Sequence, residues 1–237
     1  MTWSMIAREE KTGRVGIIVA TRFFAVGAQV PHIRTGVGAV ATQAFVHQAF
    51  GPHGLDLMAN GASADETLSK LIASDDGRDH RQVHVMDAKG RFAAHTGAAC
   101  IDWCGHTTGD GFSVAGNMLA GPEVIARTAE AYRARTDLPI AWRLLAAMHA
   151  GEAAGGDKRG KQSAALLVHD QEEFPIYDLR VDDHMDPLTE LIRLHAVALE
   201  RFVHFRRRMP SRAHPAGLTD RRDLEQFIAA SLAEGYE

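Results

Sequence analysis

The sequence predicts an α+β fold in which antiparallel sheets are covered by helices. Candidate strands and helices occur in blocks, in the order strands, helices, strands, helices, strands, helices. A doubly wound parallel sheet would instead need single strands and helices that alternate. Polar turns separate neighbouring strands within a block, as in antiparallel hairpins. Apolar residues make up 46% of the 237 residues, which suits a substantial core without metal or disulfide support.

The first block is a β-meander that opens the sequence. Residues 2–7 (TWSMIA) and 15–21 (VGIIVAT) predict two strands, and the polar segment between them contains Gly13 as a turn signal. The second strand is apolar on both faces, which predicts that it is buried. After a loop that contains Pro31, residues 36–45 (GVGAVATQAF) predict a third strand.

Helices and a second group of strands follow. Residues 51–60 predict a helix, and the capping box S-A-D-E at 63–66 begins another, with leucines at helical spacing behind it. Residues 82–87 (QVHVMD) and 91–95 (RFAAH) predict two strands joined by a tight turn. Residues 112–116 predict a further short strand.

The last part of the fold repeats this alternation of blocks. Helices over 122–135 and 139–153 both begin at a proline, which suits the first turn of a helix. Residues 163–169 (SAALLVH) and 177–181 (YDLRV) predict a pair of strands. Apolar residues at helical spacing predict a long final helix over 187–205.

The sequence predicts one domain over residues 1–205, a linker over 206–217 and a C-terminal tail over 218–237. The linker contains an arginine triplet, which suits a helix end better than a nucleic-acid surface. Apolar faces on the long final helix and on the tail predict a homo-oligomer, most simply a homodimer; alternatively, both faces cover the chain's own sheets. The apolar side of the tail consists of Leu218, Leu224, Phe227, Ile228 and Leu232.

Charge and composition exclude several kinds of partner. A formal net charge of −4 and a pI near 6.3 give no general attraction to nucleic acid. The first residues lack the basic start and apolar core of a signal peptide. No apolar run approaches the roughly 20 residues that cross a bilayer. We therefore expect a cytoplasmic bacterial protein with no membrane or nucleic-acid partner.

Two glycine-rich stretches imitate nucleotide-binding motifs. Residues 155–161 fit G-x-x-x-x-G-K, but Gln162 stands where a P-loop has Ser or Thr, and the segment lies between a helix and a strand. A P-loop needs the reverse order, because the N-terminus of the following helix binds the phosphate. Residues 36–41 (GVGAVA) match a dinucleotide fingerprint, yet they run on as a strand. We expect no cofactor.

A cluster of metal-ligand residue types gives a similarly weak signal. His95, Cys100, Asp102, Cys104 and His106 lie within twelve residues. Zinc accepts all of these types, but a single C-x-x-x-C pair does not match the spacing of structural zinc sites. We expect no metal and read the segment as a glycine-rich loop with buried thiols.

Thr2 is the most informative residue of the sequence. A small residue after Met1 usually permits removal of the initiator methionine, which would leave Thr2 at the N-terminus. Such a threonine carries a hydroxyl and, on the same residue, an α-amine with a pKa of about 8 that can accept the hydroxyl proton. Many proteins begin Met-Thr without using the threonine, and retention of Met1 would favour a role in binding.

Segments throughout residues 2–195 give the chain a specific resemblance. It resembles an uncharacterised bacterial and archaeal family, a domain of unknown function grouped with the N-terminal nucleophile (Ntn) hydrolases and their proteasome-subunit-like fold. The resemblance implies a four-layer αββα sandwich of two antiparallel sheets between helical layers, and hydrolysis of a small amide or peptide-like substrate. It rests on the segments TWSMIAREEKTGRVGIIVATRFFAVGA, GVGAVATQAF, GPHGLDLMANGASADETL, RQVHVMDAKGRFAAHTG, FSVAGNMLAGPEV, GDKRGKQSAALLV and DLRVDDHMDPLTEL.

The resemblance also implies roles for individual residues. Thr2 takes the position of the nucleophile, and Arg22 that of the charged residue after the second strand. Thr42 and Gln43 lie on the third strand, where a backbone N–H donates to the oxyanion. Asn117 could donate a side-chain hydrogen bond. Structural roles are the alternatives: a salt bridge for Arg22, a satisfied strand residue for Gln43 and a turn for Asn117.

The chain departs from the proteasome-type pattern at one point. The third strand offers no lysine to tune the amine. Lys161 could replace it, and with Asp157 and Arg159 it could form a polar, substrate-binding wall next to the N-terminus. Two other functions remain open: a non-catalytic protein that binds a small metabolite, and nucleotide binding through residues 155–161.

Overall fold

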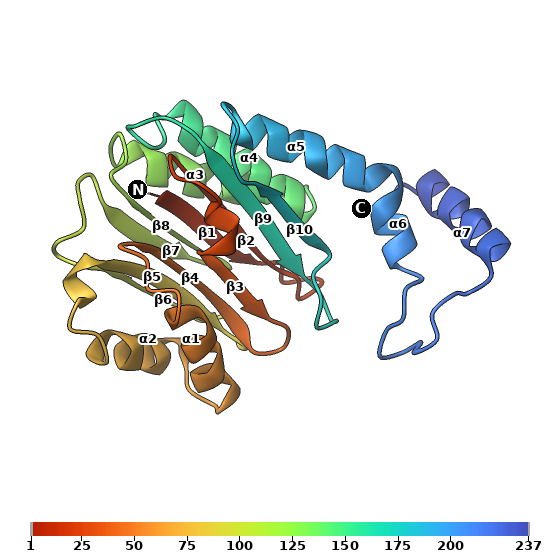
Figure 1. Cartoon of the computed structure of the whole chain (residues 1–237), viewed down its shortest axis with the longest axis horizontal. Helices are drawn as coiled ribbons and strands as arrows, with labels where there is room; N and C mark the ends of the chain where they lie inside the picture. Colours follow the sequence, from red (N-terminus) through yellow and green to blue (C-terminus); the bar gives the residue numbers. More distant parts are fainter. Residues whose placement is uncertain (1, 237) are drawn as a thin grey trace.

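Two antiparallel sheets lie face to face in the computed structural model, which describes residues 2–236 (Figure 1). The strand pairs are antiparallel throughout both sheets. The larger sheet contains, in spatial order, β10 (Tyr177–Val181), β9 (Ser163–His169), β2 (Val15–Thr21), β1 (Thr2–Arg8), β8 (Phe112–Asn117) and β7 (Gly105–Gly109). The smaller sheet contains β3 (Pro31–Arg34), β4 (Gly38–Ala44), β5 (Arg81–Asp87) and β6 (Phe92–Thr96).

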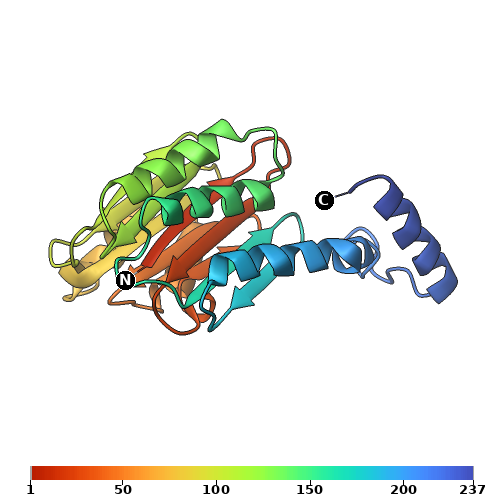
Figure 2. The same ribbon diagram turned by 90° about the horizontal axis from the view of Figure 1, so that it is seen from above.

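Helices cover the outer face of each sheet. The larger sheet is covered by α3 (Glu123–Ala134), α4 (Ile140–Ala153) and α5 (Pro187–Val197), which lie side by side when seen from above (Figure 2). The smaller sheet is covered by α1 (Phe50–Ala59) and α2 (Ala64–Ala73). The predicted αββα sandwich is therefore confirmed.

The four layers enclose three apolar cores. One lies between the larger sheet and its helices, one between the two sheets and one between the smaller sheet and its helices. The side chains of β1 alternate between the first two: Trp3 and Met5 pack against the helices, whereas Ile6 packs between the sheets. The same alternation directs Thr2 and Ser4 towards the smaller sheet. Burial of each large apolar side chain stabilises the fold by roughly 1.5–3 kcal/mol.

Local signals in the sequence explain where several elements begin and end. The predicted capping box forms at α2, because Ser63 Oγ accepts from the Glu66 backbone N–H at 3.2 Å and Glu66 Oε2 accepts from the Ser63 N–H at 2.7 Å. The glycine-rich segment that imitates a P-loop connects α4 to β9. A strand rather than a helix follows this segment, so it lacks the helix N-terminus with which a P-loop binds phosphate, as its place between a helix and a strand predicted.

Three details differ from the sequence predictions. β3 and β7 were not expected, because both are short and partly exposed and lack an apolar face. The third predicted strand begins at Gly38 rather than at residue 36, since residues 35–37 form the turn after β3. The long final helix is interrupted: after α5, a π-helical turn (Ala198–Phe202) leads into α6 (Val203–Arg206).

The C-terminal tail forms α7 (Arg221–Ala233), which lies beside α6 and projects from the sandwich (Figures 1 and 2). Two further short turns are 3-10 helices, η1 (Val26–Ala28) and η2 (Arg78–His80). Within residues 2–236, no helix has both the length and the apolar character needed to cross a membrane.

Candidate functional site

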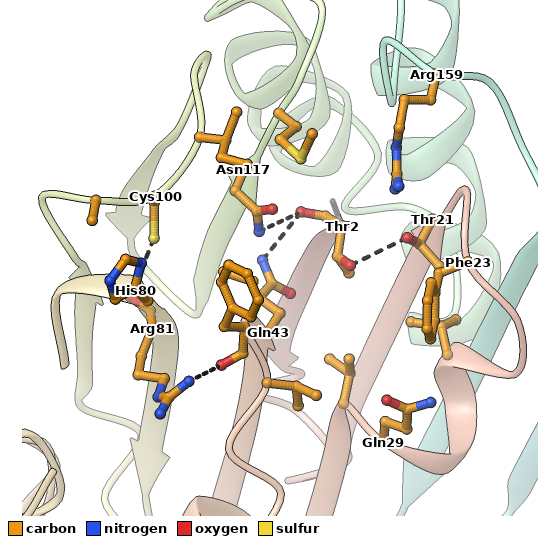
Figure 3. Close-up of a pocket in the computed structure, with 18 residues that line it drawn as sticks. Thr2, Thr21, Phe23, Gln29, Gln43, His80, Arg81, Cys100, Asn117 and Arg159 are labelled. Atoms are coloured by element: carbon orange, nitrogen blue, oxygen red, sulfur yellow. Dashed lines mark hydrogen bonds between the residues drawn. The ribbon is translucent and has the colours of Figure 1, made fainter. Parts of the chain in front are cut away.

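A cavity of about 440 Å³ opens at the edge of the sandwich where β1 begins (Figure 3). It is lined by the start of β1, the end of β2 and the loop after it, and the end of β4 and the loop after it. The start of β5, the 97–104 loop, the end of β8 and the 154–162 loop complete the lining. Thr2, Gln43, Asn117 and Arg159, four of the residues selected from the sequence, are among its lining residues.

The strand register fixes the position of Thr2. Trp3 pairs with Ala20 of β2, and Thr2 pairs with Asn117 of β8. Thr2 therefore lies beside Thr21, and the two hydroxyl oxygens are 3.2 Å apart. Thr2 is 7% exposed, and its hydroxyl lies at the cavity between the two sheets (Figure 3).

Two side-chain amides hold the backbone of Thr2. Gln43 Nε2 and Asn117 Nδ2 each donate to the Thr2 carbonyl oxygen at 3.3 Å. Both amides also donate to Oε1 of Gln82, at 2.8 and 2.9 Å. Gln82 is itself fully buried and donates to the Gly116 carbonyl at 2.8 Å. Because all three amides are buried and paired, their orientations are strongly constrained.

A polar network continues from Gln43 into the space between the sheets. Ser4 Oγ donates to Gln43 Oε1 at 2.7 Å and lies 2.9 Å from Nε2 of His84. Because the Ser4 proton is used on Gln43, His84 donates from Nε2, and its Nδ1 accepts from Ser113 Oγ at 2.9 Å. Complete burial, with a smaller repulsion from His106, lowers the pKa of His84 to about 3. The imidazole is therefore neutral near pH 7.

Backbone conformations that are rare for L-residues cluster at the cavity. Ala44 (φ 69°) and Met118 (φ 52°) are left-handed and line the cavity, and Ala25 (φ 53°) precedes the lining residue Val26. Such conformations cost of order 1 kcal/mol each and persist where the surrounding structure imposes them. Their concentration around one cavity is typical of a functional site.

Arg159 reaches the cavity because Asp157 holds it there. Asp157 is 4% exposed, and its carboxylate accepts from the Arg159 backbone N–H at 2.8 Å and from Nη2 at 3.2 Å. The same carboxylate accepts from the backbone N–H of Arg22 at 2.8 Å. Asp157 therefore joins the 154–162 loop to the end of β2, and it stands behind Arg159 rather than on the cavity wall.

Two other selected residues, Arg22 and Thr42, lie outside the cavity lining. The guanidinium of Arg22 donates to Gln162 Oε1 at 3.1 Å. Thr42 points to the opposite face of β4 from Gln43, since neighbouring side chains of a strand alternate, and its backbone N–H donates to Val30. Thr21, the last residue of β2, lies beside Thr2 instead of Arg22.

Lys161 is also absent from the cavity lining. Its Nζ lies 3.3 Å from Glu152 Oε1 and 3.4 Å from Asp186 Oδ1. Burial lowers the pKa of Lys161, but these two carboxylates outweigh that effect and raise it. A cation with a raised pKa is poorly suited to accept a proton from Thr2.

The thiols near the cavity are poor nucleophiles. Cys100 lines the cavity, and burial raises its pKa. Burial also raises the pKa of Cys104, whose Sγ donates to the Cys100 carbonyl at 3.5 Å. Across the described residues, no group of three or more His, Cys, Asp or Glu side chains could hold a metal ion.

Comparisons with known proteins show which family this chain is similar to. The model of DUF1028, described as a family of unknown function, matches residues 2–191. The solved structure of a DUF1028 protein from Silicibacter pomeroyi is 31% identical and has a TM-score of 0.86, covering 92% of this chain and 99% of that chain. None of the curated proteins compared matches the chain.

Two more distant structures are those of Anbu proteins. Anbu (ancestral beta-subunit) from Yersinia bercovieri is 10% identical with a TM-score of 0.44, covering 88% of this chain and 98% of that chain. The Anbu (Gly-1) mutant from Hyphomicrobium sp. strain MC1 is 12% identical with a TM-score of 0.46, covering 84% and 95%.

Proposed function

The chain belongs to the DUF1028 family of unknown function, and we propose that it is an Ntn-type hydrolase that cleaves a small amide or peptide-like substrate at Thr2. One observation carries the proposal. Thr2 begins a buried strand, and its hydroxyl lies at the cavity of about 440 Å³, with its carbonyl held by the amides of Gln43 and Asn117. This arrangement supports a nucleophile because it keeps the hydroxyl in one place next to a space for substrate.

The proposed reaction requires that the peptide bond before Thr2 be cut. Met1, whose removal would do this, lies outside the described residues. The Thr2 α-amine then accepts the hydroxyl proton while Oγ1 attacks the carbonyl carbon of the substrate amide. The C–N bond breaks, and the departing amine takes the proton. Water then attacks the resulting ester, which releases the acid and restores the hydroxyl.

Gln43 and Asn117 act in this proposal as positioning residues. Both amides donate to the Thr2 carbonyl, so they fix the backbone that carries the nucleophile. Thr21 Oγ1 accepts a hydrogen bond from Thr2 Oγ1 at 3.2 Å and so helps to hold the hydroxyl of the nucleophile in one orientation.

The proposal is tested by release of primary amine from a panel of N-acylated amino acids and their amides. Untagged wild-type protein is compared with Thr2→Ser and Thr2→Ala, since both replacements are small enough to permit removal of Met1. We expect Thr2→Ser to retain hydrolysis and Thr2→Ala to lose it by about 10³-fold or more. Equal activity of the Thr2→Ala protein would refute Thr2 as the nucleophile.

A non-catalytic protein that binds a small metabolite is the second candidate. The partner of the Thr2 hydroxyl favours it, because that partner is the hydroxyl of Thr21. A hydroxyl is not a base, so Thr21 cannot replace the α-amine as the proton acceptor if Met1 is retained. Ligands that raise the melting temperature of both wild-type and Thr2→Ala protein, without any turnover, would support this candidate.

A further inference from the structure

The cavity is lined by two arginines and by no carboxylate. Arg81 and Arg159 are among the lining residues together with the imidazole of His80, and no Asp or Glu of the described chain is. A pocket with basic groups and no carboxylate attracts an anionic ligand. The two arginines, however, are held in different ways.

Arg81, the first residue of β5, is held by groups of the protein itself. Its Nε lies 2.7 Å from Asp75 Oδ2, and its Nη1 donates to the Phe45 carbonyl at 2.8 Å. The bond with Arg81 lowers the pKa of Asp75, so this carboxylate stays ionised and offsets the arginine charge. Arg81 therefore supports the β4–α1 loop.

Arg159 is placed to meet a ligand. Figure 3 shows its guanidinium directed towards the cavity on the side of Thr21, across from His80 and Cys100. The side chain is 38% exposed, while Asp157 behind it is buried. Arginine carries five N–H donors in a planar fork, so one guanidinium can hold both Asp157 and a ligand carboxylate.

Large apolar side chains surround the rest of the cavity. Phe23, Phe45 and Ile101 line it, and they are 58%, 65% and 50% exposed. Two aromatic rings and an isoleucine exposed around one hollow mark a binding surface, because isolated exposed apolar residues are common but such clusters are not. They suit a hydrocarbon or aromatic group of the ligand.

We propose that the cavity takes an amide that carries both a carboxylate and an apolar group, the carboxylate bound by Arg159 and the apolar group by Phe23, Phe45 and Ile101. This inference rests on the proposed hydrolase function and names its substrate class. A carboxylate fits better than a phosphate, because Asp157 already offsets part of the Arg159 charge and would repel a dianion.

The inference is tested by calorimetric titration of Thr2→Ala protein, in which a ligand is bound but not cleaved. The probes are N-acetyl-L-phenylalanine and N-acetyl-L-phenylalaninamide, which differ only in carboxylate against neutral amide. We expect the acid to bind about tenfold more tightly than the amide, as a charge-assisted hydrogen bond predicts. Equal affinities, or tighter binding of the amide, would overturn the inference.

Two variants in the Thr2→Ala background assign the effect to one side chain. Arg159→Gln is expected to abolish the preference for the acid, and Arg159→Lys, which keeps a cation next to Asp157, to retain part of it. Lys158→Gln is the matched control, because it removes a charge from the same loop at a residue outside the lining, whose Nζ donates to the Asp102 carbonyl. A preference that survives in a folded Arg159→Gln protein contradicts the proposal.

Other measurements separate this inference from the hydrolase itself. If the acid is preferred but wild-type protein releases no amine from any carboxylate-bearing amide, the hydrolase fails while the carboxylate site stands. If amides are cleaved without regard to a carboxylate, the hydrolase stands and the inference fails. Competition by inorganic phosphate as strong as that of the acid would also overturn the choice of a carboxylate.

Discussion

His84 is a buried residue that affects both the candidate site and the stability of the molecule. It lies between the sheets with both ring nitrogens paired to serine hydroxyls, and burial lowers its pKa to about 3. The hydroxyl of Ser4 links this imidazole to Gln43, which in turn holds Thr2. A proton on His84 would therefore disturb the residue that carries the proposed chemistry.

This arrangement predicts a loss of stability in acid. Below about pH 6.5 the unfolded chain takes up a proton at His84 that the folded chain does not, so the free energy of unfolding falls by up to about 1.4 kcal/mol per pH unit until the pH approaches 3. In urea unfolding at about pH 7 and pH 5, wild-type protein should lose about 2 kcal/mol more than His84→Gln. Equal losses in the two proteins would show that His84 does not titrate in this way. Other buried histidines, such as His195, are common to both proteins and cancel.

The site was only partly predictable at the scale of residues. Thr2, Gln43, Asn117 and Arg159 were selected from the sequence, and the structure places all four around one cavity. Their roles remain predictions. Thr21 was missed in favour of Arg22, because the choice depends on the register of β1 against β2, which a sequence does not state.

Gln82 and the apolar residues that line the cavity were missed for a different reason. Gln82 lies in a strand whose sequence gives no hint that its amide turns towards Thr2. Phe23, Phe45 and Ile101 follow strands or lie in loops, and nothing local marks them as neighbours. Contacts between residues far apart in the chain become visible only when the sheets are paired.

At the scale of elements, the end of β4 is the clearest case of a local conformation that serves the site. Ala44 is the last residue of this strand, has φ 69° and lines the cavity. Alanine in the left-handed region costs roughly 1–2 kcal/mol, and glycine does not pay this cost.

Ala44→Gly should therefore raise the stability by up to about 1 kcal/mol, after the larger entropy of the unfolded glycine chain is subtracted. Ala41→Gly is the control, since Ala41 is fully buried in the same strand without a positive φ, and it should lower the stability by about 1 kcal/mol or more. Urea midpoints measure both changes. A similar decrease for the two variants would contradict the strain at Ala44.

Most elements were predictable because their sequences carry strong periodicity or end signals. The capping box at Ser63 and the apolar runs of β2 and β9 are examples. β3 and β7 were missed, since an edge strand such as GHTTG is held by backbone hydrogen bonds to one neighbour and needs no apolar pattern. The interruption of the long final helix likewise left no signal that we could read.

At the scale of the whole molecule, the C-terminal tail contributes less buried surface to the stability of the fold than the helices of the sandwich do. In α7, Ile228 and Ser231 are the residues that become buried, and Ser231 bonds to His204 of α6 at 2.7 Å. Tyr236 reaches back to Arg14 at 3.1 Å. By contrast, α5 places Leu188 and Leu191 deep in the core beneath the larger sheet. The family model also ends at residue 191.

A chain that ends after Arg206 should therefore keep the sandwich, with a single cooperative thermal transition lowered by roughly 5 °C or less. A chain that ends after Asp186 should fail to fold, because the loss of two buried leucines alone costs about 4–10 kcal/mol, comparable with the whole stability of a domain. Circular dichroism follows both. Loss of folding in the longer chain would show that the tail is part of the domain.

The predicted homodimer is tested by the mass in solution of the full chain and of the chain that ends after Arg206.

The central claim, that Thr2 acts as an N-terminal nucleophile, depends on the residue that carries the α-amine. The mass of the N-terminal peptide, measured on untagged protein expressed from its own start codon, tests this most directly. We predict a peptide that begins at Thr2, since only that residue then holds both the hydroxyl and the amine that accepts its proton. A peptide that begins at Met1 in every molecule would contradict the claim and leave the cavity as a binding site.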